Sequence, residues 1–264
     1  MFLEESAFIC PLCKQKLFKV NNSLKCLGSH SFDFAKQGYV NLLMSNASGK
    51  RHGDDRLMVE ARSRFLNKGY YDALRQTAST ILGADNIVLD AGCGEGYYTS
   101  LFEDKNNVIG IDISKDALKL ASRKCQNSQF AVASISDIPI ANESVDAVIN
   151  IFAPDSPNEF MRVLKSDGRL IMVYPMEKHL IELKAAVYDK PYLNPEVNLK
   201  REDMKLISQN ELKYTALLDC NEDILSLFKM TPYYYKTSRE DQQKLENINK
   251  LDVSLEFIIA EYQK

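Results

Sequence analysis

Five short apolar runs, separated by stretches with helical periodicity, dominate the middle of the chain. They are NIVLDAGCG (86–94), NNVIGIDIS (106–114), SQFAVAS (128–134), SVDAVINIF (144–152) and GRLIMVYP (168–175). Runs of four to six β-branched and aliphatic residues that alternate with helices are typical of a parallel sheet covered by helices on both faces. The pattern predicts an α/β fold for this part of the chain.

Two amphipathic stretches precede the first run. Their apolar spacing predicts helices over roughly 54–67 and 70–82, with Asp54 or Asp55 as the N-cap of the first. A polar loop at 45–55 comes before them. We therefore expect three parts: a small N-terminal module (1–45), a helical connector (46–84) and the α/β domain (85–264).

The composition is that of an ordinary globular protein. The chain has 264 residues and 30.0 kDa, with 45% hydrophobic and 26% charged residues, enough for one large domain and a smaller module. It shows neither a basic start followed by an apolar stretch nor an apolar window of about 18 residues. We expect a cytoplasmic protein without membrane segments, in which Cys93, Cys125 and Cys220 are small buried hydrophobes.

Charge is distributed unevenly along the chain. The net charge of -3 gives no overall attraction to nucleic acid, yet the first 52 residues carry seven cations against three anions, a local balance of +4. A basic module on an acidic body can dock on phosphate, although solvated surface lysine is an equally good interpretation. The cations are Lys14, Lys16, Lys19, Lys25, Lys36, Lys50 and Arg51.

Three cysteines and a histidine lie close together in this basic module. Cys10-x2-Cys13 is followed after twelve residues by Cys26-x3-His30, the two-knuckle spacing of a tetrahedral zinc site. A redox pair and unliganded thiols are the alternatives. Four protein ligands leave no open coordination position, so the spacing predicts one structural Zn²⁺ per chain.

A glycine-rich turn ends the first apolar run. Asp90 is followed by Gly92, Gly94 and Gly96, but Tyr97 stands where a dinucleotide fingerprint requires glycine. The G-x-G-x-G spacing after an acidic residue resembles the S-adenosylmethionine motif of Rossmann-like methyltransferases. We therefore expect a class I Rossmann-like SAM methyltransferase domain with a small N-terminal zinc-finger module.

The next runs supply further cofactor candidates. Asp112 ends the second run, 16 residues after Gly96, where a carboxylate can accept both ribose hydroxyls. Asp90 could hold the cofactor's amino group through water or backbone, and Ala133-Ser134 would lie beside the adenine. A nucleotide-like fold that binds no cofactor is the alternative.

Several motifs together carry a more specific resemblance. They are CPLC, the C-x3-H pair, FDFAKQGYVNLL, GDD...ARSRFLNKGYY, VLDAGCGEGYYT, FAP, HLIELK and MTPYYYK. In this order they resemble the ribosomal large-subunit RNA guanine-N1 methyltransferases, the RlmA/RrmA family. The likeness covers essentially residues 8–190, and the last 30 residues match only loosely.

The resemblance implies a homodimeric enzyme that methylates N1 of one guanine in a hairpin of 23S rRNA. The zinc module would recognise the RNA. By the same resemblance the zinc ligands are Cys10, Cys13, Cys26 and His30, and the cofactor contacts include Tyr71, Gly94, Glu95 and His179. A proton acceptor or an unassigned helix-start residue are the alternatives for His179.

Candidates for the reacting end of the site lie near the end of the fourth run. Guanine N1 carries a proton, and the base must be unstacked before it can react. Asn150 and Asp155 lie where acceptor groups commonly occur, so we expect them to touch the base, with loop capping as the alternative. Tyr233, Tyr234 and Tyr235 could stack on it, or pack together as a lid over the site. Arg62 and Arg64 would face phosphate or pair with Glu60.

Two other functions remain open at this point. One is a SAM-dependent methyltransferase for a small molecule, in which the zinc module is purely structural. The other is a zinc-dependent nucleic-acid binder whose cofactor fold is idle. The intact glycines and Asp112 argue against the second, and the basic N-terminal segment argues against the first.

Overall fold

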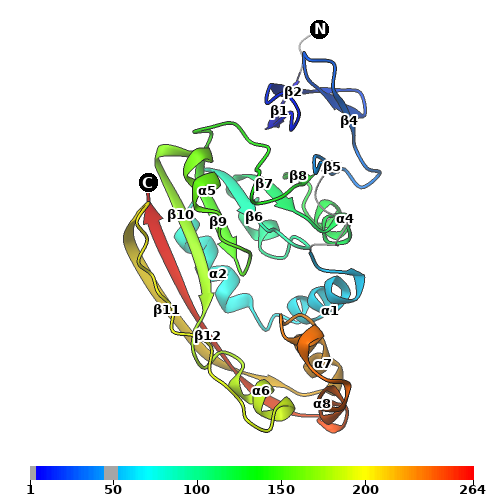
Figure 1. The fold of residues 1–264 in the computed structure, drawn as a ribbon, viewed down its shortest axis with the longest axis vertical. Coiled ribbons are helices and arrows are strands. Elements are labelled where there is room, and N and C mark those ends of the chain that lie inside the picture. The colour runs from blue at the N-terminus through cyan, green and yellow to red at the C-terminus, as the bar shows by residue number, and fades with distance from the viewer. Residues whose placement is uncertain (1–3, 45–52) are drawn as a thin grey trace.

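The structure, a computed structural model, describes residues 4–44 and 53–264. A small N-terminal body lies above a large twisted sheet, and a long strand pair runs from that sheet down to a cluster of helices (Figure 1). Residues 45–52, which hold Lys50, Arg51 and the predicted boundary between module and connector, lie outside the described residues.

The large body is built on one mixed sheet, whose parallel part is formed by the five predicted runs. These strands are β6 (Ile87–Ala91), β7 (Asn107–Asp112), β8 (Gln129–Val132), β9 (Val145–Ile151) and β10 (Leu164–Pro175). Their spatial order, β8-β7-β6-β9-β10, reverses between β6 and β9 as in doubly wound folds. The predicted α/β architecture is confirmed.

Three further strands extend this sheet beyond the prediction. β12 (Leu251–Gln263) pairs antiparallel with β10, and β11 (Lys205–Leu218) pairs with β12 at one edge. At the other edge, β5 (Val40–Asn41) pairs in parallel with β8. The hydrophobic pattern does not mark β11 because most of its side chains are exposed, and β5 is only two residues long.

The N-terminal body is a small antiparallel sheet of order β1-β2-β3-β4. Its strands are β1 (Glu4–Ile9), β2 (Lys16–Val20), β3 (Ser23–Lys25) and β4 (Ser31–Asp33). Leu17 and Leu24 are fully buried within it. A sheet of this size buries too little apolar surface to be stable alone, which favours a metal as its second source of stability.

Helices cover both faces of the large sheet and form the lower cluster in Figure 1. The α-helices are α1 (Arg56–Asn67), α2 (Asp72–Leu82), α3 (Thr99–Phe102), α4 (Lys115–Lys124), α5 (Pro157–Val163), α6 (Ile181–Val187), α7 (Asn221–Lys229) and α8 (Arg239–Gln243); short 3-10 helices lie at η1 (Tyr234–Lys236) and η2 (Lys244–Asn247). The Asp55 carboxylate accepts the Met58 N–H at 3.0 Å, which confirms this N-cap. Both connector helices begin and end within two residues of the prediction.

Alternate residues of the parallel strands face opposite apolar layers. Val88 and Ile149 pack into one layer with α1, α2 and α7, whereas Leu89 and Val148 pack into the other. Period-two alternation with both faces buried is expected of a sheet between two helical layers. Within the described ranges, every helix is too short or too polar to cross a lipid bilayer.

Candidate functional site

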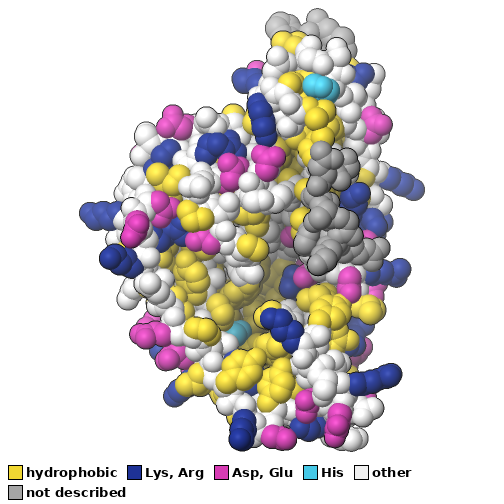
Figure 2. Space-filling model, in the orientation of Figure 1, with side chains coloured by type: hydrophobic (Ala, Val, Ile, Leu, Met, Phe, Trp, Pro, Cys, Tyr) yellow, Lys and Arg dark blue, Asp and Glu magenta, His cyan; other side chains and the backbone are white. Residues whose placement is uncertain are grey.

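A cleft of about 910 Å³ opens at the carboxyl ends of β6 and β9. Figure 2 shows a hollow, lined largely by hydrophobic side chains, between the upper body and the lower helices. Ligands of open α/β sheets bind where the strand order reverses, and the volume is near the top of the range for small-molecule sites, about 300–1,000 Å³. The cleft brings together the predicted residues Tyr71, Gly92, Gly94, Glu95, Asp112, Ser134, Asp155 and His179.

The glycines after β6 shape one wall of this cleft. Gly94 has a φ of +55°, and a Cβ added there would meet open space. Gly92 has a φ of +85°, and a Cβ there would lie 2.4 Å from the Ala153 Cβ. Gly94 therefore leaves room for a ligand, while Gly92 lets the loops after β6 and β9 approach each other.

Asp112 fixes this loop from the end of β7. Its carboxylate accepts the Gly94 N–H at 2.9 Å and the Ser114 N–H at 2.7 Å. Burial raises the pKa of Asp112, and these two backbone donors oppose the rise. The carboxylate is thus held at the cleft wall in a fixed orientation, as acceptance of ribose hydroxyls requires.

Glu95 presents a second buried carboxylate to the cleft. One of its oxygens forms an ion pair with Lys124, whereas Oε1 has no hydrogen-bond partner among the described residues. The buried Tyr98 hydroxyl, also in the cleft lining, is likewise unpartnered there. Unpaired buried polar atoms are rare in native proteins, so these two atoms fit a cofactor that carries its own donors and acceptors.

Tyr71 and His179 meet at the far side of the cleft. The Glu256 N–H donates to His179 Nδ1 at 3.3 Å, and Nε2 lies 3.5 Å from the Tyr71 hydroxyl. Burial and the nearby Lys184 charge lower the pKa of His179 to about 3. A neutral ring whose Nδ1 accepts carries its proton on Nε2, so this histidine can donate toward the cleft.

Three predicted site residues lie outside the cleft lining. Asp90 is buried and its Oδ2 accepts the Thr99 hydroxyl at 2.6 Å. Gly96 packs against Ala121 of α4. Asn150 donates to Pro154 O at 2.9 Å and accepts the Ala153 N–H at 3.1 Å. The Asn150 amide is therefore used within the turn after β9, as in the alternative of loop capping, and it does not line the cleft.

The remaining candidates divide between the cleft and its rim. Asp155 lines the cleft, where Arg201 Nη1 donates to its carboxylate at 2.7 Å. Tyr233 also lines it, whereas the Tyr235 side chain is exposed and bonds to the Asp55 carboxylate.

Of the two alternatives for the connector arginines, pairing with Glu60 is not what the structure shows. Arg56 pairs with Glu60 one helical turn away. Arg62, in the cleft lining, forms its ion pair with Asp54, and Arg64 pairs with Glu222. Arg62 and Arg64 face these carboxylates because both acids come from segments packed against α1.

One end of the cleft, here called the aromatic chamber, was not predicted from the sequence, apart from Tyr233. Lys184, Tyr192, Asn194 and Tyr233 form it. Leu180, Leu183 and Val187 form an apolar stripe with helical spacing, and Lys184 occupies the remaining position of that stripe. A lysine at a core position of an amphipathic helix is a signal that could have identified it.

The four predicted zinc ligands converge in the N-terminal body. Their ligand atoms all lie within 4.8 Å of one another. His30 Nδ1 is 3.5 Å from Cys10 Sγ and 3.4 Å from Cys26 Sγ, and Cys13 Sγ is 3.5 Å from Cys26 Sγ. Three thiols and an imidazole on two tight turns suit a tetrahedral Zn²⁺.

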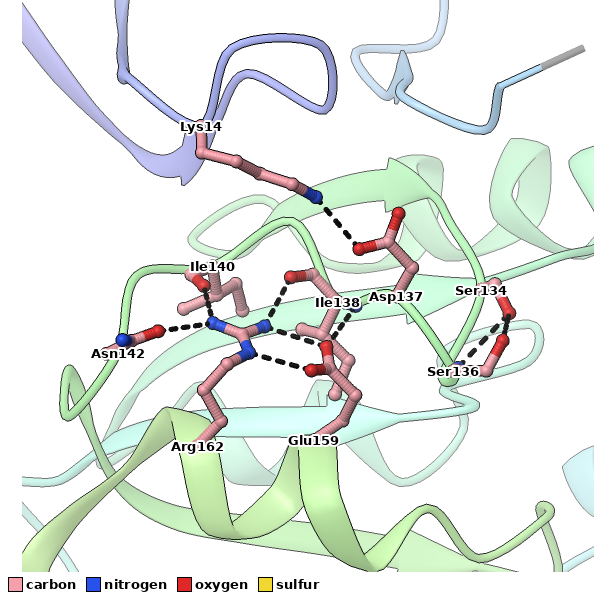
Figure 3. A network of polar contacts seen from close by, with 9 residues as sticks. All are labelled: Lys14, Ser134, Ser136, Asp137, Ile138, Ile140, Asn142, Glu159 and Arg162. Carbon is pink, nitrogen blue, oxygen red and sulfur yellow. Dashed lines mark hydrogen bonds and ion pairs between the residues drawn. The ribbon is translucent and has the colours of Figure 1, made fainter.

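The N-terminal body rests on the segment 134–142 after β8 (Figure 3). Lys14 forms a salt bridge to Asp137 at 2.9 Å, and Ile9 N–H donates to Pro139 O at 2.9 Å. From below, Arg162 donates to the Ile138 and Ile140 carbonyls, both at 2.7 Å. The segment that seats the small body is therefore clamped from the large one.

Two family models match complementary parts of the chain. The model described as "RlmA, N-terminal", a zinc ribbon, matches residues 8–48, and the model described as "Methyltransferase domain" matches residues 82–249. These matches correspond to the body that carries the cysteine and histidine cluster and to the body that carries the cleft. The chain therefore consists of an N-terminal zinc ribbon and a domain with the SAM-dependent methyltransferase fold.

Individual relatives align with the chain as well, one of them along nearly its whole length. "Putative 23S rRNA (guanine-N(1)-)-methyltransferase YxjB" of Bacillus subtilis is 30% identical over 274 residues, covering 96% of each chain. The "23S rRNA (guanine(748)-N(1))-methyltransferase" of Streptomyces fradiae is 34% identical over 189 residues, covering 67% of this chain and 66% of its own. The chain belongs to the family of 23S rRNA (guanine-N1)-methyltransferases.

Proposed function

We propose that this protein transfers a methyl group from S-adenosylmethionine to N1 of one guanine in 23S rRNA. The observation that carries the proposal is one continuous cleft, in which the glycine loop and Asp112 meet an aromatic chamber. The match to YxjB along 96% of both chains supports the same substrate class. A ribosomal substrate also agrees with the expected cytoplasmic location.

The donor half of the cleft would hold the cofactor by its polar groups. Asp112 would accept the ribose hydroxyls, with Ser134 beside the adenine. The unpartnered Glu95 Oε1 would accept from the ammonium group, and the Nε2–H of His179 would donate to the carboxylate together with Tyr71. The bound cofactor supplies a methyl group on a positively charged sulfur.

The acceptor half would hold an unstacked base. Guanine N1 lies on the base-pairing edge, so the nucleotide must leave its helix before it can react. Tyr192 and Tyr233 offer aromatic faces for stacking. Alignment of the two partners in one cleft can supply most of the rate enhancement, because methyl transfer is an in-line displacement without a covalent enzyme intermediate.

The zinc ribbon would bind the rRNA outside the cleft. Cys10, Cys13, Cys26 and His30 would hold one zinc ion, which stiffens the module without taking part in the reaction. Lys14 and Lys16 pair with Asp137 and Glu5, so Lys25 and Lys36 are the cations we propose for phosphate contacts. The resemblance also implies a homodimer, which light scattering would show as a particle of twice 30.0 kDa.

Methylation at N1 blocks the pairing edge, so reverse transcriptase stops at the modified guanine. Purified protein and S-adenosylmethionine should create one new stop on unmodified 23S rRNA. Asp112→Ala should raise the Kd for S-adenosylmethionine about 100-fold, because two charge-assisted hydrogen bonds are lost. Asp112→Asn, which keeps the side-chain shape, should have a smaller effect in the same direction.

Asp116→Ala is the matched control for this experiment. Asp116 lies on α4 near Asp112, but its carboxylate pairs with Lys119 on the surface, so both the stop and the Kd should persist. Unmodified rRNA together with methylation of a small acceptor would overturn the proposal. Full binding of S-adenosylmethionine by Asp112→Ala would remove Asp112 from the site.

A further inference from the structure

Lys184, on α6, is a lysine whose side chain is almost completely buried. Its side chain is among the largest that are fully buried, with 2% of the residue exposed. Nζ donates to Tyr192 O at 3.1 Å and to Asn194 Oδ1 at 2.6 Å. It also lies 4.5 Å from the ring centre of Tyr192 and 5.9 Å from that of Tyr233.

The environment of this ammonium group contains no counter-charge. Among the described residues, no carboxylate lies within 4.0 Å of Nζ, whereas the half-buried Lys124 and Lys165 pair with Glu95 and Asp146. Burial accordingly lowers the pKa of Lys184. A buried charge that has hydrogen bonds but no counter-charge is still costly, so a ligand on which negative charge develops would stabilise Lys184.

One hydrogen-bond donor of Lys184 remains for such a ligand. An ammonium group has three N–H donors, and the described residues offer acceptors for two of them. Since Lys184 lines the cleft, an oxygen of a base stacked in the chamber can reach the third. The chamber therefore combines flat aromatic walls with a single cation, which suits a base that carries an electron-rich carbonyl oxygen.

We propose that the aromatic chamber receives the target guanine and that the Lys184 ammonium donates a hydrogen bond to its O6 during methyl transfer. This inference rests on the proposed function and assigns a residue to it. Guanine presents an acceptor at O6, whereas adenine presents an N6–H₂ donor at the same place. Lys184 would therefore also select guanine over adenine.

The role follows from the electron balance of the reaction. The N1 proton leaves to water, and the negative charge that remains on the base spreads to O6. The N1–C bond then forms as the C–S bond breaks, with its electron pair returning to sulfur, and the base ends neutral. A cation at O6 stabilises the base while it is anionic.

Three titratable groups near Lys184 have pKa values displaced away from neutrality. Burial and the Lys184 charge lower the pKa of His179 to about 3. Burial raises the pKa of Tyr192 and Tyr233 above the ordinary tyrosine value. Ionisation of the base and of Lys184 is therefore what the comparison of Lys184 variants across pH is designed to detect.

The test measures single-turnover methylation of 23S rRNA by the full-length zinc-loaded protein as a function of pH. Lys184→Met should lower the rate constant about 100-fold near neutral pH, as loss of one preorganised charge-stabilising donor does. The loss should shrink at alkaline pH, where N1 ionises without help. Lys184→Arg, which keeps the charge, should recover part of the rate, and the Kd for S-adenosylmethionine should stay within about twofold in both variants.

Lys244→Met is the matched control. Lys244 also bonds to the end of α6, through Val187 O at 3.2 Å, but its ammonium pairs with Asp189 and Asp241 outside the cleft. Its rate and pH profile should match the wild type. An unchanged rate in Lys184→Met, or a loss equal at every pH and not relieved by Lys184→Arg, would overturn the assignment. Absence of methylation by the wild-type protein would instead overturn the proposed function.

Discussion

The zinc ribbon and the methyltransferase domain are stabilised by different means. The ribbon buries few side chains, among them Leu17 and Leu24, around its cysteine and histidine cluster. The large domain spreads its stability over two apolar layers on either face of a long sheet. We expect substitution of any of the four candidate zinc ligands to destabilise the ribbon strongly. In the large domain, the loss of one core side chain should have a smaller effect, because many residues share the stabilisation.

Removal of the metal should produce the largest difference between the two parts. Structural zinc contributes on the order of 10 kcal/mol to a small module, so Cys26→Ser or a strong chelator should unfold the ribbon. We expect methylation of 23S rRNA to be lost, while the Kd for S-adenosylmethionine remains unchanged. Elemental analysis measures the zinc content, calorimetry measures the Kd, and the reverse-transcriptase stop measures methylation.

Cys220→Ser serves as the control because this half-buried cysteine lies on the large domain. It should retain one zinc per chain and normal methylation. A Cys26→Ser protein that still held a full equivalent of zinc would contradict the ligand set.

The second effect concerns the buried carboxyl of Asp90 in the large domain. Burial raises the pKa of Asp90 from 3.8 to about 7. Between these values the unfolded chain loses a proton that the folded protein keeps, so folding stability falls as pH rises. Relative to Asp90→Asn, the wild type should lose about 1.4 kcal/mol of unfolding free energy per pH unit over this window.

Urea denaturation at several pH values measures this difference, and Asp146→Asn supplies a control of opposite sign. Although burial acts against it, donation from Lys165 and the Ile87 N–H lowers the pKa of Asp146. The wild type should therefore lose stability relative to Asp146→Asn only as pH falls toward that lowered pKa. A difference between wild type and Asp90→Asn that does not vary with pH would show that Asp90 keeps its ordinary pKa.

A smaller effect is expected at the support under the ribbon. Arg162 donates to Glu159, to two carbonyls of the segment 134–142 and to Asn142. Arg162→Ala should cost about 2 kcal/mol of unfolding free energy, because several charge-assisted bonds are lost together. Arg123→Ala, on the last turn of α4, is a control expected to change stability by less than about 0.5 kcal/mol.

The smallest effect is expected at the contact between the two parts. Lys14 and Asp137 form an exposed salt bridge, and such pairs contribute about 0–1 kcal/mol. A double-mutant cycle with Lys14→Ala and Asp137→Ala should give a coupling energy in that range that decreases with salt. A coupling energy several times larger would mean that this salt bridge contributes more to the contact between ribbon and large domain than an exposed pair normally does.

Most residues of the proposed donor half lie together as the sequence predicts, because they are local in the chain. Gly92, Gly94 and Glu95 follow one strand, and Asp112 ends the next. Parallel strands bring their carboxyl ends to one edge, so short-range patterns suffice to place these residues together. The metal cluster is equally local, since it depends on two knuckles within 21 residues, Cys10 to His30.

The proposed acceptor half could not be predicted in the same way. Lys184 and Tyr192 lie on either side of the end of α6, and Tyr233 comes from the turn after α7. Their meeting depends on the β11–β12 pair, whose exposed strand lacks an apolar run. For Asn150 the prediction from local position was wrong. It lies near the end of its strand, but its amide bonds within the following turn and not toward the cleft.

The segment after β8 gives the two parts a shared element. Ser134 and Asp137 are bridged to each other, one at the wall of the donor pocket and the other under the ribbon. If the ribbon binds rRNA as proposed, the loop that seats it is the same loop that supplies Ser134 to the cleft, so the two contacts are only three residues apart along the chain.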